Sequence, residues 1–161
     1  MSKYWFEEAK VNDLLRIEGP LGSFFLRESK CEHIVFLATG TGIAPIKSIL
    51  ESVMEQPSNF SKKEFWVFVG ARFKEDLLWT PDVRNDKIKI NYIPVLSRQV
   101  EDWNGEKGYV QDSVLKQKID LENTQVYACG SNEMIQSAKK LLFENLLNEK
   151  SFFSDAFIQT N

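Results

Sequence analysis

The feature that most constrains the fold is an apolar run that breaks at two glycines and resumes at helical spacing. Residues Ile34 to Ala38 are apolar, Thr39 to Gly42 form a glycine-containing turn, and apolar residues then recur three and four positions apart. This pattern predicts a buried strand, a tight turn, and a helix whose free N–H groups face the turn. Such a turn suits a phosphate or pyrophosphate, although a strand leading into a packed helix without any ligand would give the same pattern.

The turn departs from the dinucleotide-binding fingerprint G-x-G-x-x-G at its third glycine. Pro45 stands there instead, and it fits the first helical turn, where no N–H is needed. The stretch alone therefore leaves both interpretations open.

Composition and charge argue against several classes of function. The chain has 161 residues, a hydrophobic fraction of 43% and a net charge of -3, which is ordinary for a soluble globular domain and gives no support to nucleic-acid binding. No apolar run reaches membrane-spanning length, and the first ten residues do not resemble a secretory signal. Cys31 and Cys129 are far apart in the sequence, so we expect no cysteine metal site. The small number of cysteines and the N-terminal residues together favour a cytoplasmic chain. His33 stands beside charged residues, and we expect it to be exposed to solvent.

Strand-like and helix-like segments alternate after residue 30. The pattern predicts four further strands, at Glu64 to Gly70, Ile88 to Ser97, Gln125 to Gly130 and Phe152 to Ile158. It predicts helices after Gly42, at Lys74 to about Trp79, within Tyr109 to Ile119, and after Asn132 as its cap. We therefore expect an α/β fold, a five-stranded parallel Rossmann-like sheet with helices on both faces and ligands at the carboxyl ends of its strands.

The first thirty residues do not look like the start of a domain. Asp13 to Glu18 and Phe24 to Arg27 are typical of two short strands joined by the turn Gly19 to Gly22. Two strands form no stable sheet alone, so they must pack on the remainder of the chain or belong to a barrel that is missing or supplied elsewhere.

Motifs at the predicted strand ends resemble one family when taken together. They are GTGIAP at 40–45, G-x-R-x-x-E-D-L at 70–77, VLSR at 95–98, W-x-G-x-x-G-Y-V at 103–110 and C-G-x-x-x-M at 129–134. The set resembles the ferredoxin–NADP reductase family of flavoprotein reductases, and GPLGSFFL at 19–26 and SDAF at 154–157 extend the resemblance to nearly the whole chain. Among its members the chain looks most like reductases of oxygenases and CDP-6-deoxy-glucoseen reductases.

One departure from the family concerns the flavin. The family binds FAD through an R-x-Y-[ST] motif on a barrel, and this sequence contains no such motif. Only about two barrel strands fit before His33. The resemblance therefore implies that residues 1–30 are a remnant of the flavin-binding barrel and residues 31–161 the NAD(P)H-binding domain, with FAD bound only if the missing barrel is supplied.

The resemblance also implies roles for strand-end residues. Its cofactor-binding set is Gly40, Thr41, Gly42, Ile43, Pro45, Gly70, Arg72, Ser97, Arg98, Tyr109, Cys129, Gly130 and Met134. The pyrophosphate would lie on Gly40 to Gly42, with Thr41 donating a hydrogen bond or capping the helix. Gly70 would admit the adenosine, and Arg72 would face the cofactor or a partner, or pair with the neighbouring Glu75 and Asp76.

The choice between NADPH and NADH stays open. Ser97 and Arg98 could bind a 2′-phosphate and Tyr109 could stack on adenine, and together with Lys107 they resemble the set of NADP-specific members. Against this, the loop containing Trp103 resembles that of NADH-using members.

Three residues are assigned by the resemblance to the place of hydride transfer: Cys129, Asp155 and Phe157. Cys129 would shape the nicotinamide pocket, since no histidine or second cysteine accompanies it to make a nucleophile. Asp155 would lie near the nicotinamide, and Phe157 would stack near the flavin or serve as a core aromatic in an edge strand.

The implied function is transfer of a hydride from NAD(P)H to FAD and of electrons onward to an iron–sulfur or other acceptor. Partners would be a nicotinamide nucleotide and, for a chain without a barrel, a flavin-binding chain and an iron–sulfur protein; no metal, membrane or nucleic acid is expected. The alternatives are a nucleotide-binding regulatory module and a truncated reductase without redox activity of its own.

Overall fold

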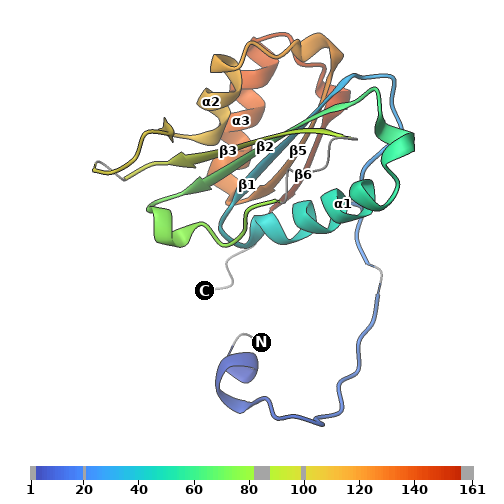
Figure 1. Cartoon of the computed structure of the whole chain (residues 1–161), viewed down its shortest axis with the longest axis vertical. Coiled ribbons are helices and arrows are strands. Elements are labelled where there is room, and N and C mark those ends of the chain that lie inside the picture. The colour runs from blue at the N-terminus through green and yellow to red at the C-terminus, as the bar shows by residue number, and fades with distance from the viewer. Residues whose placement is uncertain (1–2, 20, 82–87, 99–100, 157–161) are drawn as a thin grey trace.

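A computed structural model describes residues 3–19, 21–81, 88–98 and 101–156. Its core is one parallel sheet in the order β4-β3-β2-β1-β5-β6 (Figure 1). The strands are β1 (His33–Thr39), β2 (Glu64–Ala71), β3 (Lys89–Leu96), β4 (Glu106–Lys107), β5 (Thr124–Gly130) and β6 (Phe152–Ala156). The predicted α/β fold and the five strands predicted for the sheet are confirmed, and the two-residue β4 adds a sixth strand at one edge. The predicted end of the last strand, at Ile158, lies outside the described residues.

Helices cover both faces of the sheet, as predicted. Helix α1 (Ile43–Glu55) lies on one face, and α2 (Val110–Lys116) and α3 (Asn132–Glu144) lie on the other (Figure 1). The helix predicted from Lys74 is only a 3₁₀ turn, Lys74–Asp76. Within the described ranges, none of the helices combines the length and apolar character needed to cross a membrane.

The cap of α3 differs from the prediction by one residue. The Ser131 hydroxyl, rather than Asn132, accepts a hydrogen bond from the Met134 backbone N–H at 3.2 Å. Both residue types are good caps, and extended backbone at the cap position decides between them; here Ser131 is extended, while Asn132 is already helical.

The central strand β1 supplies both halves of the core. Its side chains alternate, so Val35 and Leu37 pack under α2 and α3, while Ile34 and Phe36 pack under α1. All four are buried, as expected of a strand covered on both faces. Helix α1 begins shortly after the end of β1, and α3 begins shortly after the end of β5.

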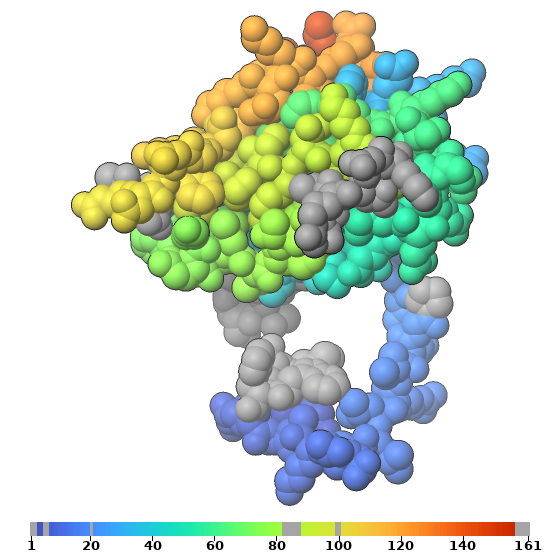
Figure 2. All heavy atoms as spheres, in the orientation of Figure 1, coloured from blue at the N-terminus to red at the C-terminus, as the bar shows by residue number. Residues whose placement is uncertain are grey.

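The N-terminal arm, residues 3–19 and 21–32, contains no strand among these described residues. The strands predicted at 13–18 and 24–27 are therefore wrong for this structure. A strand needs a neighbour to accept its backbone hydrogen bonds, and Leu14 and Ile17 are 100% and 87% exposed with no such neighbour. The first part of the arm includes a π-helical turn at Tyr4–Glu8 and lies apart from the sheet and its helices (Figures 1 and 2).

The last part of the arm packs on the α1 face of the sheet. The Arg27 backbone N–H donates to the Tyr127 hydroxyl at 2.8 Å, and the Arg27 guanidinium lies over the rings of Phe25 and Phe153. The Lys63 ammonium donates to the Ser29 carbonyl at 2.8 Å. Residues from about 24 onward thus pack against the sheet, and Phe24 and Leu26 lie against the apolar cluster on its α1 face.

Candidate functional site

The predicted site residues gather at the carboxyl edge of the sheet, because all strands run in the same direction. Gly40 to Gly42 follow β1, Arg72 follows β2, Ser97 and Arg98 follow β3, and Gly130 ends β5. Segments far apart in the sequence are therefore brought to one edge, as the sequence predicted.

The turn after β1 offers an open backbone. Gly40 to Gly42 form one 3₁₀ turn, and α1 begins at Ile43. Gly40 has a φ of +54°, and among the described residues other than its chain neighbours no heavy atom lies within 4 Å of the position that its Cβ would occupy. The exposed Gly40 and Thr41 therefore present main chain to whatever binds at this edge.

The start of α1 has no side-chain cap among the described residues. The capping role considered for Thr41 is thus not formed. The start of α3 is satisfied differently, by its own Ser131 hydroxyl. Of these two helix ends, α1 is the one whose first turn has no side-chain acceptor, which suits an anionic phosphate group.

At the other glycines of the site, atoms of the protein lie close to the position that a Cβ would occupy. A Cβ on Gly42 would overlap the Cys129 carbonyl oxygen, and one on Gly130 would overlap the Thr39 hydroxyl. A Cβ on Gly70 would lie 3.0 Å from Val110 Cγ1. These glycines let β1, β2 and β5 end close together. The side chains of Val110 and Thr39 lie where a Cβ of Gly70 would point, and the approach of adenosine to Gly70 stays a prediction.

Thr39 is a residue of the site that sequence reasoning missed. Its Oγ1 accepts a hydrogen bond from the Ser131 backbone N–H at 3.2 Å and fits against Gly130. The contact joins the ends of β1 and β5, which are 92 residues apart in sequence. No periodic signal marks such a contact; the pairing of a strand-end hydroxyl with a glycine on the neighbouring strand is visible only in the fold.

Two predicted cofactor contacts are core residues. Ile43 and Met134 are 5% and 8% exposed and belong to the packed faces under α1 and α3. They support the turn after β1 and the end of β5 from below. Pro45 lies in the first turn of α1, as predicted.

Arg72 and Arg98 are brought together. The Arg98 backbone N–H donates to the Arg72 carbonyl at 3.0 Å, and the Ser97 N–H donates to the Ala71 carbonyl at 2.9 Å, so the ladder between β2 and β3 continues past their ends. Both arginines are exposed. Within the described part of the chain no ion pair joins Arg72 to Glu75 or Asp76, and both guanidinium groups are available to an anionic ligand at this corner.

Lys107 and Tyr109 reach the same corner through β4. Lys107 is paired with Leu96, and the Gly108 N–H donates to the Leu96 carbonyl at 3.0 Å. Tyr109 directly precedes α2 and is 64% exposed. The four residues predicted to distinguish NADPH from NADH therefore lie at or just after the ends of the neighbouring strands β3 and β4.

Cys129 is buried next to Asp155 in the register of β5 and β6. Burial, and then the negative charge of Asp155, raise the pKa of the Cys129 thiol to about 11. The thiol is therefore neutral at physiological pH and is suited to shaping a pocket rather than to nucleophilic attack. Phe157 lies outside the described residues. No group of three or more His, Cys, Asp or Glu side chains that could hold a metal occurs in the part of the chain described.

A parallel sheet with an open glycine turn and an uncapped helix start at its carboxyl edge defines a nucleotide-binding α/β domain. The sequence profile of the family described as the oxidoreductase NAD-binding domain matches residues 36–140. The chain belongs to this family, and the predicted resemblance to ferredoxin reductases is confirmed.

Two curated relatives indicate the kind of protein in which this domain occurs. The chain is 40% identical to the CDP-6-deoxy-L-threo-D-glycero-4-hexulose-3-dehydrase reductase of Yersinia pestis, over 95% of the chain and 46% of that protein. It is 31% identical to the anthranilate 1,2-dioxygenase electron transfer component of Acinetobacter baylyi, over 100% of the chain and 47% of that protein. The chain thus spans about half the length of the curated relatives it matches.

A solved structure shows the same fold. The flavohem-like FAD/NAD binding domain of nitric oxide dioxygenase from Vibrio cholerae superposes with a TM-score of 0.81 at 17% identity, over 97% of this chain and 63% of that one. At this identity the likeness establishes the arrangement of elements.

Proposed function

We propose that the chain binds NAD(P)H and serves as the nicotinamide-nucleotide half of a flavoprotein electron-transfer reductase. The observation that carries the proposal is the open Gly40–Thr41 turn at the uncapped start of α1, which lies beside the buried end of β5 at Cys129 and Gly130. Membership in the oxidoreductase NAD-binding family supports it.

In this proposal each part of the edge holds one part of the nucleotide. The pyrophosphate lies on the Gly40–Gly42 turn, and the nicotinamide lies toward Cys129 and Asp155 on the paired strands β5 and β6. The adenosine lies toward Arg98 and Tyr109. A bound flavin would supply the hydride acceptor, so these residues need only bind and orient the nucleotide.

The flavin would come from outside the described residues. We assign residues 1–30 to the flavin-binding side and residues 31–161 to the nucleotide-binding side. The exposed apolar residues of the arm, among them Leu14 and Ile17, support an attachment there. Phe157 follows the last described strand and is proposed to face the flavin.

The electron acceptor is proposed from the relatives. One is named as the electron transfer component of a dioxygenase and another as the reductase of a dehydrase, so we propose an iron–sulfur or similar redox protein as the partner of this chain. The two free cysteines are in keeping with the cytoplasmic setting that we propose for the chain.

Calorimetric titration with NADPH and with NADH tests the proposal. We expect binding, and we expect Arg98→Ala to weaken NADPH about tenfold while changing NADH little, because a charge-assisted bond to a phosphate contributes roughly 1.5 kcal/mol or more. Arg16→Ala, in the exposed arm, is the matched control. Absence of binding by both nucleotides would refute the proposal, and an equal effect of Arg98→Ala on both would remove Arg98 from a 2′-phosphate site.

A regulatory nucleotide-binding module is the second candidate, and it would use the same open Gly40–Thr41 turn at the start of α1. It predicts the same binding but no consumption of NADPH when the chain is mixed with a flavin-binding partner and an electron acceptor. Turnover in that mixture would exclude it.

A further inference from the structure

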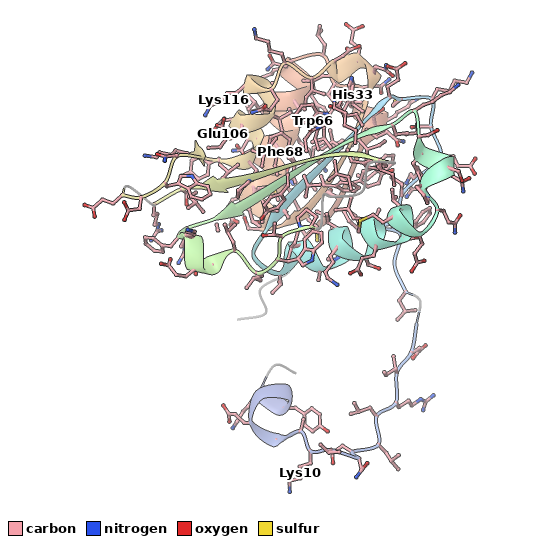
Figure 3. All side chains as sticks on the ribbon, in the orientation of Figure 1. Lys10, His33, Trp66, Phe68, Glu106 and Lys116 are labelled. Carbon is pink, nitrogen blue, oxygen red and sulfur yellow. The ribbon has the colours of Figure 1, made fainter. Side chains whose placement is uncertain are left out.

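A carboxylate outside the predicted site ties the edge strand β4 to helix α2 (Figure 3). Glu106 Oε2 accepts hydrogen bonds from Lys116 Nζ at 2.8 Å and from Ser113 Oγ at 3.4 Å. Ser113 is fully buried, so its hydroxyl depends on a protein acceptor. One side chain of β4 therefore satisfies two donors on α2.

The backbone around Glu106 is held as well. Trp103 Nε1 donates to the Glu106 carbonyl at 2.8 Å, and the Trp103 ring leaves no room for a Cβ on Gly105. On the other side, the Gly108 N–H donates to Leu96 at the end of β3. The segment from 103 to 108 is thus fixed by polar contacts at several points.

About half of the residues in this segment are exposed, and the others are only partly buried. An open hollow of about 470 Å³ lies between β3, residues 104–107 and the end of α2, and Pro94, Gly105 and Lys116 are among its lining residues. With an open hollow on one side, the segment is held in part by the bonds of Glu106 and Trp103.

We propose that Glu106 is a positioning residue for the nucleotide site. Successive side chains of a strand point to opposite faces, so Glu106 directed at α2 turns Lys107 away from it. Holding Glu106 therefore also fixes Lys107 and the nearby Tyr109, and the proposed function assigns Tyr109 to the adenosine end. The inference rests on that proposed function, and the benefit to affinity is that the segment is ordered before the nucleotide arrives.

The test compares Glu106→Ala, Glu106→Gln and the control Glu122→Gln, an exposed carboxylate at the amino edge of the sheet. Hydrogen exchange of the Gly108 amide is measured without nucleotide, and dissociation constants are measured for NADPH and NADH. Glu106→Ala should speed exchange and weaken both nucleotides about fivefold. Glu106→Gln keeps an acceptor for Lys116 and Ser113 and should recover most of the affinity; the control should change neither quantity.

Two results would overturn the inference: unchanged Gly108 exchange in Glu106→Ala, or faster exchange with unchanged dissociation constants. Lys116→Met removes the same bond from the other side and serves as the second variant if Glu106→Ala does not fold. If the wild-type chain binds neither nucleotide, the proposed function fails and the inference with it, whereas wild-type binding that resists both variants rejects the inference alone.

Discussion

Glycine is needed at different positions of the carboxyl edge for different physical reasons. At Gly40 the missing Cβ leaves open space and permits a φ of +54°, whereas at Gly42 and Gly130 it lets neighbouring strands approach. The motif in the sequence treats Gly40 and Gly42 alike as ligand contacts. The structure separates a position that faces outward from positions that hold the turn in place.

Alanine substitutions should separate these roles. Gly42→Ala would overlap the Cys129 carbonyl and should cost about 3 kcal/mol of unfolding free energy through overpacking. Gly40→Ala meets no atom and should cost only about 1 kcal/mol for its left-handed backbone, yet weaken nucleotide binding. Urea denaturation and calorimetry check the pair, and equal losses of stability would contradict this distinction.

Most elements of the fold were predictable from periodicity, and the exceptions depend on partners. The apolar runs of β1, β2 and β5 read as buried strands and are buried. The two-residue β4 is too short to carry a pattern. The alternation at 13–18 is a real pattern, but without a neighbouring strand it gives only extended chain.

The candidate site was predictable in its location but less so in its contacts. A parallel sheet places strand ends at one edge, so the neighbourhood of Gly40, Arg98 and Cys129 followed from sequence. The Thr39–Ser131 hydrogen bond and the role of Glu106 did not, because they depend on side-chain packing between segments far apart in the chain.

At the amino edge of the sheet, Glu64 of β2 contacts side chains of the neighbouring strands β1 and β3. Its carboxylate accepts hydrogen bonds from Lys89 Nζ at 2.6 Å and Asn91 Nδ2 at 2.8 Å and lies 3.5 Å from His33 Nδ1. His33, expected to be exposed, is thus partly buried. Burial alone would raise the pKa of Glu64, but the bonds from Lys89 and Asn91, with the charges of Lys89 and His33, lower it.

This arrangement predicts a loss of stability in acid. Because the pKa of Glu64 is lower in the folded chain, its contribution is present above the ordinary carboxyl range and is lost as pH falls through the lowered pKa. Glu64→Gln should therefore reduce stability at pH 7 by about 1 kcal/mol, and the difference from wild type should shrink below about pH 4. Urea denaturation across pH checks this; a difference that is constant with pH would contradict it.

At the scale of the molecule, the chain combines a packed sheet with an arm that is only partly attached. Arg27 anchors the arm between Phe25 and Phe153 and to Tyr127, while residues such as Leu14 remain exposed. Leu14 and Ile17 of the arm and the Gly40–Thr41 turn at the carboxyl edge of the sheet are exposed in this structure. A nucleotide at the edge and a flavin-binding partner at the arm would account for both.

The most direct test of the central claim is backbone NMR of the chain during titration with NADPH. The account predicts the largest shift changes at the amides of Gly40 to Ile43 and of Gly130 to Met134, with smaller ones at Arg98 and Tyr109. Absence of shifts, or shifts centred on the amino edge of the sheet around Glu64, would contradict a nucleotide site at the carboxyl edge.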